Sequence, residues 1–294
     1  MNSSLDTPTL ARTTTRTRAE IRAPRDPALR GRWWRFVLIA LITAIAIVPI
    51  VSVFYLALLP GLGSKTTGLT LENFILVFTQ TQVAIWIRNS LLVALVTVVV
   101  AVCVAAPAGY VLSRGRNLLV SGYALTLFII QALPVVTAVI PLFILFAKLG
   151  LVDNLLGVMI IYTGATMSVA VWMMGGYYDS IPVSLEEAAW IDGASIFGGF
   201  LRIVLRNSLP GILSTAIFSF LLAWNDYLVA LVFLISAPVH TFPVGLESFF
   251  QENAVNWGPV SACAVFMMLP PIILFAILNR YFSIGGIGGS LAGQ

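Results

Sequence analysis

Charge is the first thing that this sequence lacks. Only 10% of its 294 residues are Asp, Glu, Lys or Arg, whereas soluble globular proteins carry about 25% charged residues. Hydrophobic residues make up 59% of the chain, and the mean hydropathy is +0.99. This composition excludes an ordinary soluble enzyme, a disordered chain and a nucleic-acid-binding protein, and it indicates an integral membrane protein.

Cysteine and histidine are also scarce. Cys103 and Cys263 both lie within apolar runs, so they offer neither a disulfide framework nor a CxxC metal site, and we expect both to be small packing residues. His240 is the only histidine, so this chain alone cannot build a multi-histidine metal centre, and we predict no metal site. The dispersed acids give no nucleophile and base pair, which argues against a membrane-embedded enzyme with catalytic residues of its own.

Long apolar runs are what the sequence has in abundance. Six apolar runs, uncharged except for Asp226 in the fifth, are long enough to cross a bilayer as helices, which takes about 20 apolar residues. They cover residues 36–59, 91–112, 118–146, 155–175, 209–235 and 260–277. Pro134 and Pro141 interrupt the third run, and prolines there can kink or break the helix. We therefore predict an all-α membrane protein with six transmembrane helices.

The few charges are unevenly placed along the chain. Eight of the 16 cations are arginines within the first 35 residues. If the N-terminus is cytoplasmic, that side collects 13 cations and the other side three, so the positive-inside rule places both termini in the cytoplasm. We expect a disordered, basic cytoplasmic tail over residues 1–31, a six-helix domain over residues 32–284, and a Gly-rich cytoplasmic tail over residues 285–294.

The longest cytoplasmic connection between helices has the most structured pattern. Ser184 and Glu187 form an S-x-x-E capping box that predicts the start of a short helix. Asp192 and Gly193 should end this helix, because glycine adopts a left-handed backbone without steric cost. A second helical stretch should begin near Ser195. Periodicity alone leaves two interpretations of this helix–turn–helix element open, a docking surface for a partner and a helix lying on the lipid.

The same residues resemble a known motif. Glu187-Ala188-Ala189, followed by Gly193 and Ile203 at fixed spacing, resembles the EAA loop of bacterial ABC importer permeases. The triplet Asp192-Gly193-Ala194 is similar to the carbohydrate-uptake branch, the maltose- and trehalose-type permeases, and the chain as a whole resembles their smaller, MalG-like subunit. One departure is that Arg206 stands where the motif has proline, while Pro210 follows four residues later.

A second motif lies in the fifth apolar run. The segment Trp224-Asn225-Asp226-Tyr227 resembles the tryptophan-asparagine-acid signature of the family. Asp226 is the only acid well inside a predicted span, in the outer half of the fifth helix, and a charge there should face a cavity or a partner rather than lipid. Two roles stay open for these four residues. They could line the sugar pathway, or they could form a structural bond at the contact with a partner permease.

The resemblance implies the ABC importer type I (MetI-like) permease fold, with the EAA loop, residues 181–210, as a cytoplasmic coupling helix. It assigns ATPase coupling to Glu186, Glu187, Ala188, Ala189, Asp192, Gly193 and Ala194. It also implies a bacterial inner-membrane location and three kinds of partner: a second, MalF-like permease, a MalK-like ATPase dimer that binds ATP and Mg²⁺, and an extracytoplasmic substrate-binding protein. This chain itself would bind no cofactor.

The expected function is that of a permease subunit for an ATP-driven importer of di- or oligosaccharides, and not that of an enzyme. One alternative is a permease for another small polar solute such as glycerol phosphate. An alternative of a different class is a secondary transporter that works without an ATPase. That class predicts ionisable groups at the membrane midplane and internal repeats, and apart from Asp226 the spans are nearly free of ionisable groups.

Overall fold

The structure is a computed structural model that describes residues 32–61, 67–250 and 255–291. All regular structure in these ranges is helical, which confirms the all-α class. The chain divides into two compact units, Met1–Ile50 and Val51–Gln294, and the candidate sites described below belong to the second unit. The predicted basic tail, residues 1–31, and the last residues of the predicted Gly-rich tail, 292–294, lie outside the described residues.

Four helices of the described chain are each long and apolar enough to cross a membrane, and two bent pairs raise this to as many as six. The four are α1 (Arg32–Leu58), α3 (Val83–Arg114), α6 (Leu155–Asp179) and α13 (Trp257–Leu291). The bent pairs are α4 (Leu118–Ala132) with α5 (Val135–Lys148), and residues Ile196–Asn207 with α10 (Leu209–Asn225). The shorter elements are α2 (Glu72–Gln80), α7 (Ser184–Ile191), α8 (Ile196–Gly199), the π-helix η2 (Phe200–Val204), α9 (Leu205–Asn207), α11 (Leu228–Phe233), α12 (Phe242–Glu247) and the 3₁₀ turns η3 (Ala237–Val239) and η4 (Ser248–Phe250).

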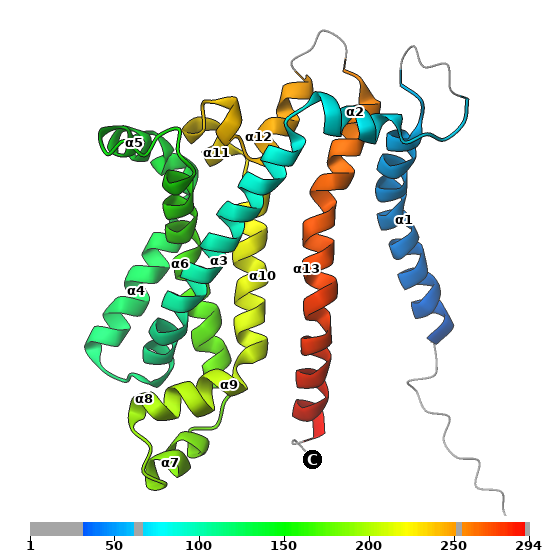
Figure 1. The fold of residues 1–294 in the computed structure, drawn as a ribbon. Helices are drawn as coiled ribbons and strands as arrows, with labels where there is room; N and C mark the ends of the chain where they lie inside the picture. Colours follow the sequence, from blue (N-terminus) through cyan, green and yellow to red (C-terminus); the bar gives the residue numbers. More distant parts are fainter. Residues whose placement is uncertain (1–31, 62–66, 251–254, 292–294) are drawn as a thin grey trace, which may run out of the picture. The chain divides into compact units, whose positions relative to one another are not determined.

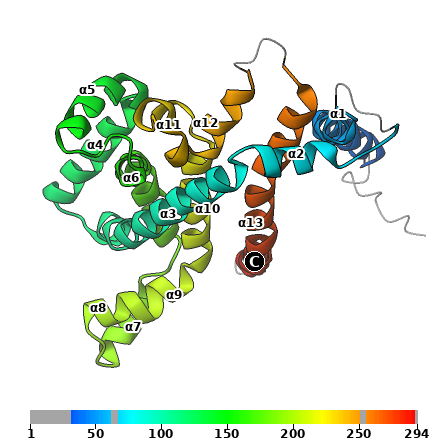
Figure 2. The same ribbon diagram turned by 45° about the horizontal axis from the view of Figure 1, so that its top comes forward.

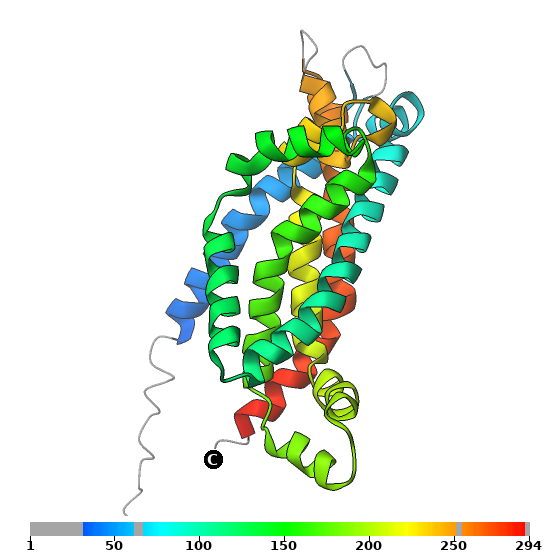
Figure 3. The ribbon, with the colours of Figure 1, turned by 90° about the vertical axis from the view of Figure 1, so that its left-hand side faces the viewer.

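The third predicted span is broken at the first of its two prolines. Leu133 is extended, with φ −83° and ψ 120°, and Pro134 caps α5, so that α4 and α5 meet at 93°. The residue before a proline is pushed away from helical backbone, which explains why the chain turns here. Pro141 lies inside α5 without ending it. As a result α5 lies across the end of α6 instead of continuing α4 (Figure 3).

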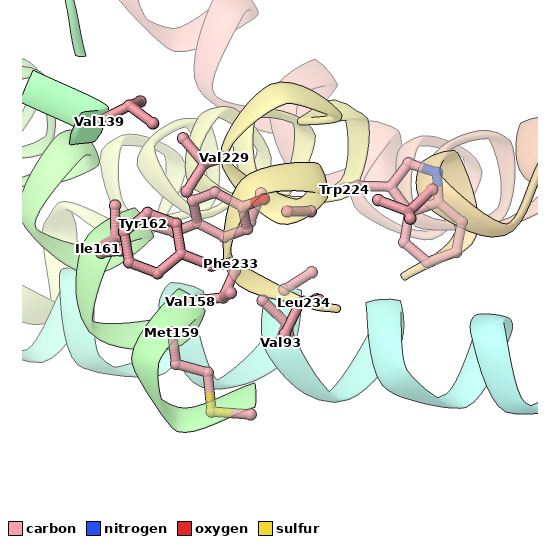
Figure 4. Close-up of a cluster of buried hydrophobic side chains, with 14 of the residues drawn as sticks. Val93, Val139, Val158, Met159, Ile161, Tyr162, Trp224, Val229, Phe233 and Leu234 are labelled. Atoms are coloured by element: carbon pink, nitrogen blue, oxygen red, sulfur yellow. The ribbon is translucent and has the colours of Figure 1, made fainter. Parts of the chain in front are cut away.

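The centre of the second unit is the packing of α3, α6 and α10 side by side (Figures 1 and 2). Glycine brings α3 and α6 close together: a Cβ atom on Gly109 would lie 2.7 Å from Cβ of Met174 and 2.9 Å from the backbone N of Gly175. Small residues have this role at helix contacts in membranes, where no hydrophobic effect drives helices together. Figure 4 shows the apolar cluster at one end of this contact, where Tyr162 of α6 packs with Phe233 and Val229 of α11.

Side-chain hydrogen bonds stabilise one end of the second unit, the end at which α12 lies. We call this end the α12 end. The second predicted span begins earlier than expected, since α3 starts at Val83, and this places Asn89 inside the helix. The Asn89 side-chain amide donates to the carbonyls of Pro238 and His240, at 3.0 and 2.9 Å. Asp153 accepts hydrogen bonds from Ser236, through its hydroxyl and its backbone N–H, and these bonds hold the pKa of the Asp153 carboxyl below its ordinary value.

Candidate functional site

The predicted helix–turn–helix element forms the opposite end of the unit, the α7 end (Figure 1). Helix α7 ends at Ile191, and Gly193 follows in the left-handed region with φ +88°. Ser195 then caps α8, its hydroxyl accepting a hydrogen bond from the N–H of Gly198 at 3.1 Å. The turn at Gly193 and the restart near Ser195 are both confirmed.

The predicted capping box is wrong. The N-cap of α7 is Val183, and no side chain caps the helix. The chain already turns at Pro182, since the N–H of Leu185 donates to the Pro182 carbonyl at 3.2 Å and that of Glu186 to the Val183 carbonyl at 2.9 Å. Ser184 is therefore the first helical residue, one position too late for its hydroxyl to cap the helix.

Glu186 points into the protein, whereas sequence analysis grouped it with the acids of the coupling surface. Its side chain is 1% exposed. One carboxylate oxygen accepts a hydrogen bond from Nε of Arg114 at 2.8 Å and forms an ion pair with Nη2 of Arg114, also at 2.8 Å. The other oxygen accepts from the Tyr110 hydroxyl at 2.6 Å. A buried carboxylate needs such partners, because leaving it unpaired would cost several kcal/mol. Glu186 thus anchors α7 to the end of α3.

Arg114 extends this anchor to the end of α6. Its Nη2 donates to the Ile181 carbonyl at 3.0 Å, and its Nη1 donates to the Ser113 hydroxyl at 3.1 Å. The Ser113 hydroxyl in turn donates to the Asp179 carboxylate at 2.5 Å. Arg114 and its neighbour Ser113 therefore link the end of α3 to α7 and to the end of α6. In the sequence, Arg114 is one of the 13 cations assigned to the cytoplasmic side, and no spacing signal connects it to Glu186 so far along the chain.

The rest of the predicted coupling set lies on the surface. Glu187, Ala188, Asp192 and Gly193 are exposed, and Ala189 and Ala194 are half-buried. Three large apolar side chains that were not among the predicted residues lie beside them on the surface. Ile191 is 86% exposed, and Ile196 and Phe197 are both 67% exposed. An exposed apolar group next to a carboxylate and a glycine turn is typical of a surface that another protein covers.

The second helix continues past Arg206, the position at which the motif has proline. The π-helix η2 and α9 carry the second helix through Arg206 to Asn207, and the chain bends by 73° only at Ser208. Pro210 then lies in the first turn of α10, a position that tolerates its missing N–H. The proline four residues after the motif position therefore lies next to the bend.

The second predicted set, residues 224–227, is divided by the structure. Trp224 is fully buried, stacks on Phe220 with ring centroids 5.7 Å apart, and donates from Nε1 to the Met267 carbonyl at 3.1 Å. Asn225 is exposed and binds the Leu221 carbonyl of its own helix, at 2.9 Å. Tyr227 is half-buried. A pathway role for Asn225 and Tyr227 stays a prediction.

The predicted placement of Asp226 inside the fifth helix is wrong. Helix α10 ends at Asn225, and Asp226 is extended, with φ −69° and ψ 127°. Its Oδ1 atom accepts from the Tyr162 hydroxyl at 2.7 Å and from the N–H of Val229 at 3.0 Å. The carboxylate therefore binds a free backbone N–H group in the first turn of α11 and joins this helix to α6. These local hydrogen bonds compete with the continuation of α10 through Asp226.

Replacing Asp226 with alanine is expected to lower the free energy of unfolding by about 1–3 kcal/mol, because the buried Tyr162 hydroxyl loses its acceptor and α11 loses its cap. Thermal unfolding of the purified protein measures this loss. The matched control is Asn225→Ala, which removes an exposed amide one residue earlier and should leave the unfolding temperature unchanged. Equal unfolding temperatures for the two variants would contradict a structural role for Asp226.

Three comparisons with known proteins agree with one another. The family described as "Binding-protein-dependent transport system inner membrane component" matches residues 105–283. The trehalose transport system permease protein SugB of Mycobacterium tuberculosis is 30% identical over 280 residues, covering 90% of this chain and 99% of the relative. The maltodextrin transport system permease protein MalD of Streptococcus pneumoniae is 34% identical over 224 residues, 75% of this chain and 79% of the relative.

A solved structure has the same fold. A chain of a bacterial ABC transporter involved in the import of the acidic polysaccharide alginate superposes with a TM-score of 0.72 at 22% identity, covering 86% of this chain and 98% of that chain.

Proposed function

The chain belongs to the family of inner membrane components of binding-protein-dependent transport systems, and we propose that it is the permease subunit of an ATP-driven importer of di- or oligosaccharides. A permease of this family is a multi-pass inner-membrane subunit that works with a second permease, an ATPase and a substrate-binding protein. The names of two relatives, a trehalose and a maltodextrin transport system permease, support a sugar as the substrate.

The single observation that supports the coupling role is that two adjacent glutamates differ in burial and in partners. Glu186 fastens α7 to α3 from inside, while Glu187 stays exposed beside Ile191 and Gly193. A force applied to the exposed face of α7 would therefore reach α3 through a buried ion pair rather than through a loose loop. We propose that an ATPase subunit covers this face and that a basic group on it pairs with Glu187.

We propose that the α7 end faces the cytoplasm and that both termini lie there. Arg114, Arg116, Arg202 and Arg206 belong to this end, and the positive-inside rule favours the cytoplasm for it. The partner subunits would be MalF-like and MalK-like, and the ATPase dimer would bind ATP and Mg²⁺. In the described part of the chain, no three His, Cys, Asp or Glu side chains are grouped as metal ligands.

Co-purification and reconstitution test the proposed function. The tagged chain should bring down an ATPase subunit and a second permease, and proteoliposomes that hold this complex should take up radiolabelled trehalose or maltotriose only with ATP and the binding protein present. Uptake of glycerol phosphate in place of these sugars would support the alternative substrate. Uptake by the lone chain without ATP would overturn the proposal in favour of a secondary transporter.

Gly193→Pro is expected to uncouple ATP hydrolysis from uptake. Proline holds φ near −65° and lacks the N–H that Gly193 donates to the Trp190 carbonyl at 3.0 Å, so the turn at φ +88° is lost. Forcing a residue out of such a turn costs at least about 1–2 kcal/mol, so uptake should fall about tenfold or more. The measurement is sugar uptake per ATP hydrolysed in proteoliposomes.

The chain offers a closely matched control for this variant. Gly150 also has a positive φ, +68°, and also donates its N–H backwards, to the Ala147 carbonyl, but it lies at the α12 end. Gly150→Pro should cost similar local stability and leave the ratio of uptake to hydrolysis near that of the unchanged protein. A normal ratio in Gly193→Pro would count against a coupling role for this turn.

A further inference from the structure

One face of α6 lines three consecutive pockets between it and the bent pair α4–α5. The residues that α6 contributes recur every three or four positions, which is one face of a helix. They are Ile160, Ile161, Gly164, Ala165, Val169, Trp172, Met173, Gly175, Gly176 and Asp179. Because this stripe extends almost from one end of α6 to the other, the pockets together form a groove, which we call the α6 groove.

The α6 groove is apolar over its first part. Near the α12 end a pocket of about 370 Å³ lies under the break at Pro134, between α5 and α6. An added Cβ atom on Gly164, which lines it, would find no heavy atom within 4 Å, so the pocket is open at that point. The 93° bend between α4 and α5 is what exposes this part of α6.

The middle of the α6 groove combines an indole, a phenyl ring and an amide. A pocket of about 590 Å³ is lined by Phe128 and Gln131 of α4 and by Val169, Trp172 and Met173 of α6. Trp172 is 44% exposed, unlike the buried Trp224. Among the described residues, Gln131 is exposed and its side-chain amide makes no hydrogen bond to the protein. An amide without a partner is costly against hydrocarbon, so this position favours a polar occupant.

The α6 groove becomes polar toward the α7 end. Trp172 also lines the next pocket, of about 320 Å³, together with Ser113, Arg116, Ser121 and Asp179. Gly176 also lines this pocket, and an added Cβ atom there would have no heavy atom within 4 Å. The groove thus passes from apolar walls, past an indole and an amide, to hydroxyl and charged groups beside the coupling element.

From this arrangement, and resting on the proposed function, we propose that the α6 groove is this chain's share of the sugar pathway, with Trp172 and Gln131 as its sugar-binding residues. A sugar ring has apolar C–H faces that pack on an aromatic face and a rim of hydroxyls that an amide can bind through both its oxygen and its nitrogen. Pockets of this kind, mostly apolar with a few convergent polar groups, are the usual form of small-molecule sites. Lipid in the groove would leave the Gln131 amide without a hydrogen-bond partner.

Cysteine labelling in the assembled complex tests the α6 groove without reference to sugar uptake. In a background with Cys103→Ala and Cys263→Ala, single cysteines are placed by Gly164→Cys, by Gly176→Cys and, as control, by Val99→Cys in the middle of α3. Val99 is exposed but lines none of the three pockets. A hydrophilic, anionic methanethiosulfonate should label both groove cysteines at least about tenfold faster than the control, because thiolate forms in water and not in lipid.

Protection and transport complete the test. Trehalose or maltotriose, delivered by the binding protein, should slow labelling of the groove cysteines, and Trp172→Ala should raise the KM for uptake about tenfold while Trp172→Phe keeps it within about twofold. Groove cysteines as slow as Val99→Cys would overturn the proposal, since lipid or a partner helix would then fill the groove. Rapid labelling without protection would overturn its assignment to sugar. Either of these two results is compatible with a working ATP-driven importer. Failure of the proposed function would show instead as the absence of the complex with an ATPase subunit or as the absence of sugar uptake.

Discussion

Replacing Arg114 with alanine is expected to lower the free energy of unfolding by about 3 kcal/mol and to release α7 from the end of α3. Removing one partner of a buried ion pair costs about 3–5 kcal/mol, because the other charge stays buried without compensation. Glu186 is 1% exposed and Arg114 18%, so we expect the lower end of that range. The alanine variant also loses the bonds to Ile181 and Ser113.

A graded series separates the ion pair from general damage. Glu186→Gln keeps a hydrogen-bonding group of the same shape and should cost less than Arg114→Ala. Tyr110→Phe removes only the 2.6 Å hydrogen bond to the Glu186 carboxylate and should cost about 1.5 kcal/mol. Glu187→Gln changes the adjacent exposed carboxylate, so it should leave stability unchanged while weakening coupling.

Thermal unfolding and limited proteolysis of the α7 segment measure this series. The expected order of destabilisation is Arg114→Ala, Glu186→Gln, Tyr110→Phe and then Glu187→Gln, with faster cleavage near Ser184 in the first two. If Glu187→Gln lowered the unfolding temperature as much as Arg114→Ala, the assignment of one glutamate to the interior and the other to the surface would be wrong.

Gly109→Leu is expected to force α3 and α6 apart and thereby to lower the stability of the protein strongly. Even a methyl group at this position would lie 2.7 Å from Met174 Cβ, 2.9 Å from the Gly175 backbone N and 3.0 Å from the Val171 carbonyl oxygen. Two of these three neighbours are backbone atoms, which cannot move aside as a flexible side chain can. Overpacking of a core costs about 1–3 kcal/mol, and more where backbones must separate.

The matched control is Gly122→Leu, which makes the same change on another helix. An added Cβ on Gly122 of α4 would have no heavy atom within 4 Å. The folded yield from fluorescence-detected gel filtration and the unfolding temperature should fall sharply for Gly109→Leu and little for Gly122→Leu. Similar losses in both variants would mean that the close approach at Gly109 does not hold the two helices together.

These two sites lie on one line of contacts. The buried ion pair joins α7 to the last residue of α3, and Gly109, little more than one helical turn before it, joins α3 to α6. The α6 groove follows another face of the same α6 helix. A displacement of α7 therefore has a path of direct contacts, without a flexible loop, to the helix that lines the proposed sugar pathway.

Several features of this protein could be predicted from the sequence because they are local. The low charge and the six apolar runs determine the membrane class, since the transfer of side chains into lipid depends on composition and length. The positive φ at Gly193 could also be predicted from the residue type, because almost any other residue would be strained in that turn. The EAA spacing likewise led to the family that the comparisons show.

Other features were decided only by the tertiary structure. An apolar run stays apolar whether its helix is straight or bent, so hydropathy could not show that Pro134 breaks a span while Pro141 does not, or that Asp226 ends α10 to cap α11. Two adjacent glutamates look alike in sequence. Glu186 is buried and Glu187 exposed because Arg114 and Tyr110, more than 70 residues earlier in the chain, meet only the first of them. The sequence by itself determined that this chain crosses the membrane and carries an EAA-type loop. Only packing between distant segments decided which side chains hold that loop and where the α6 groove opens.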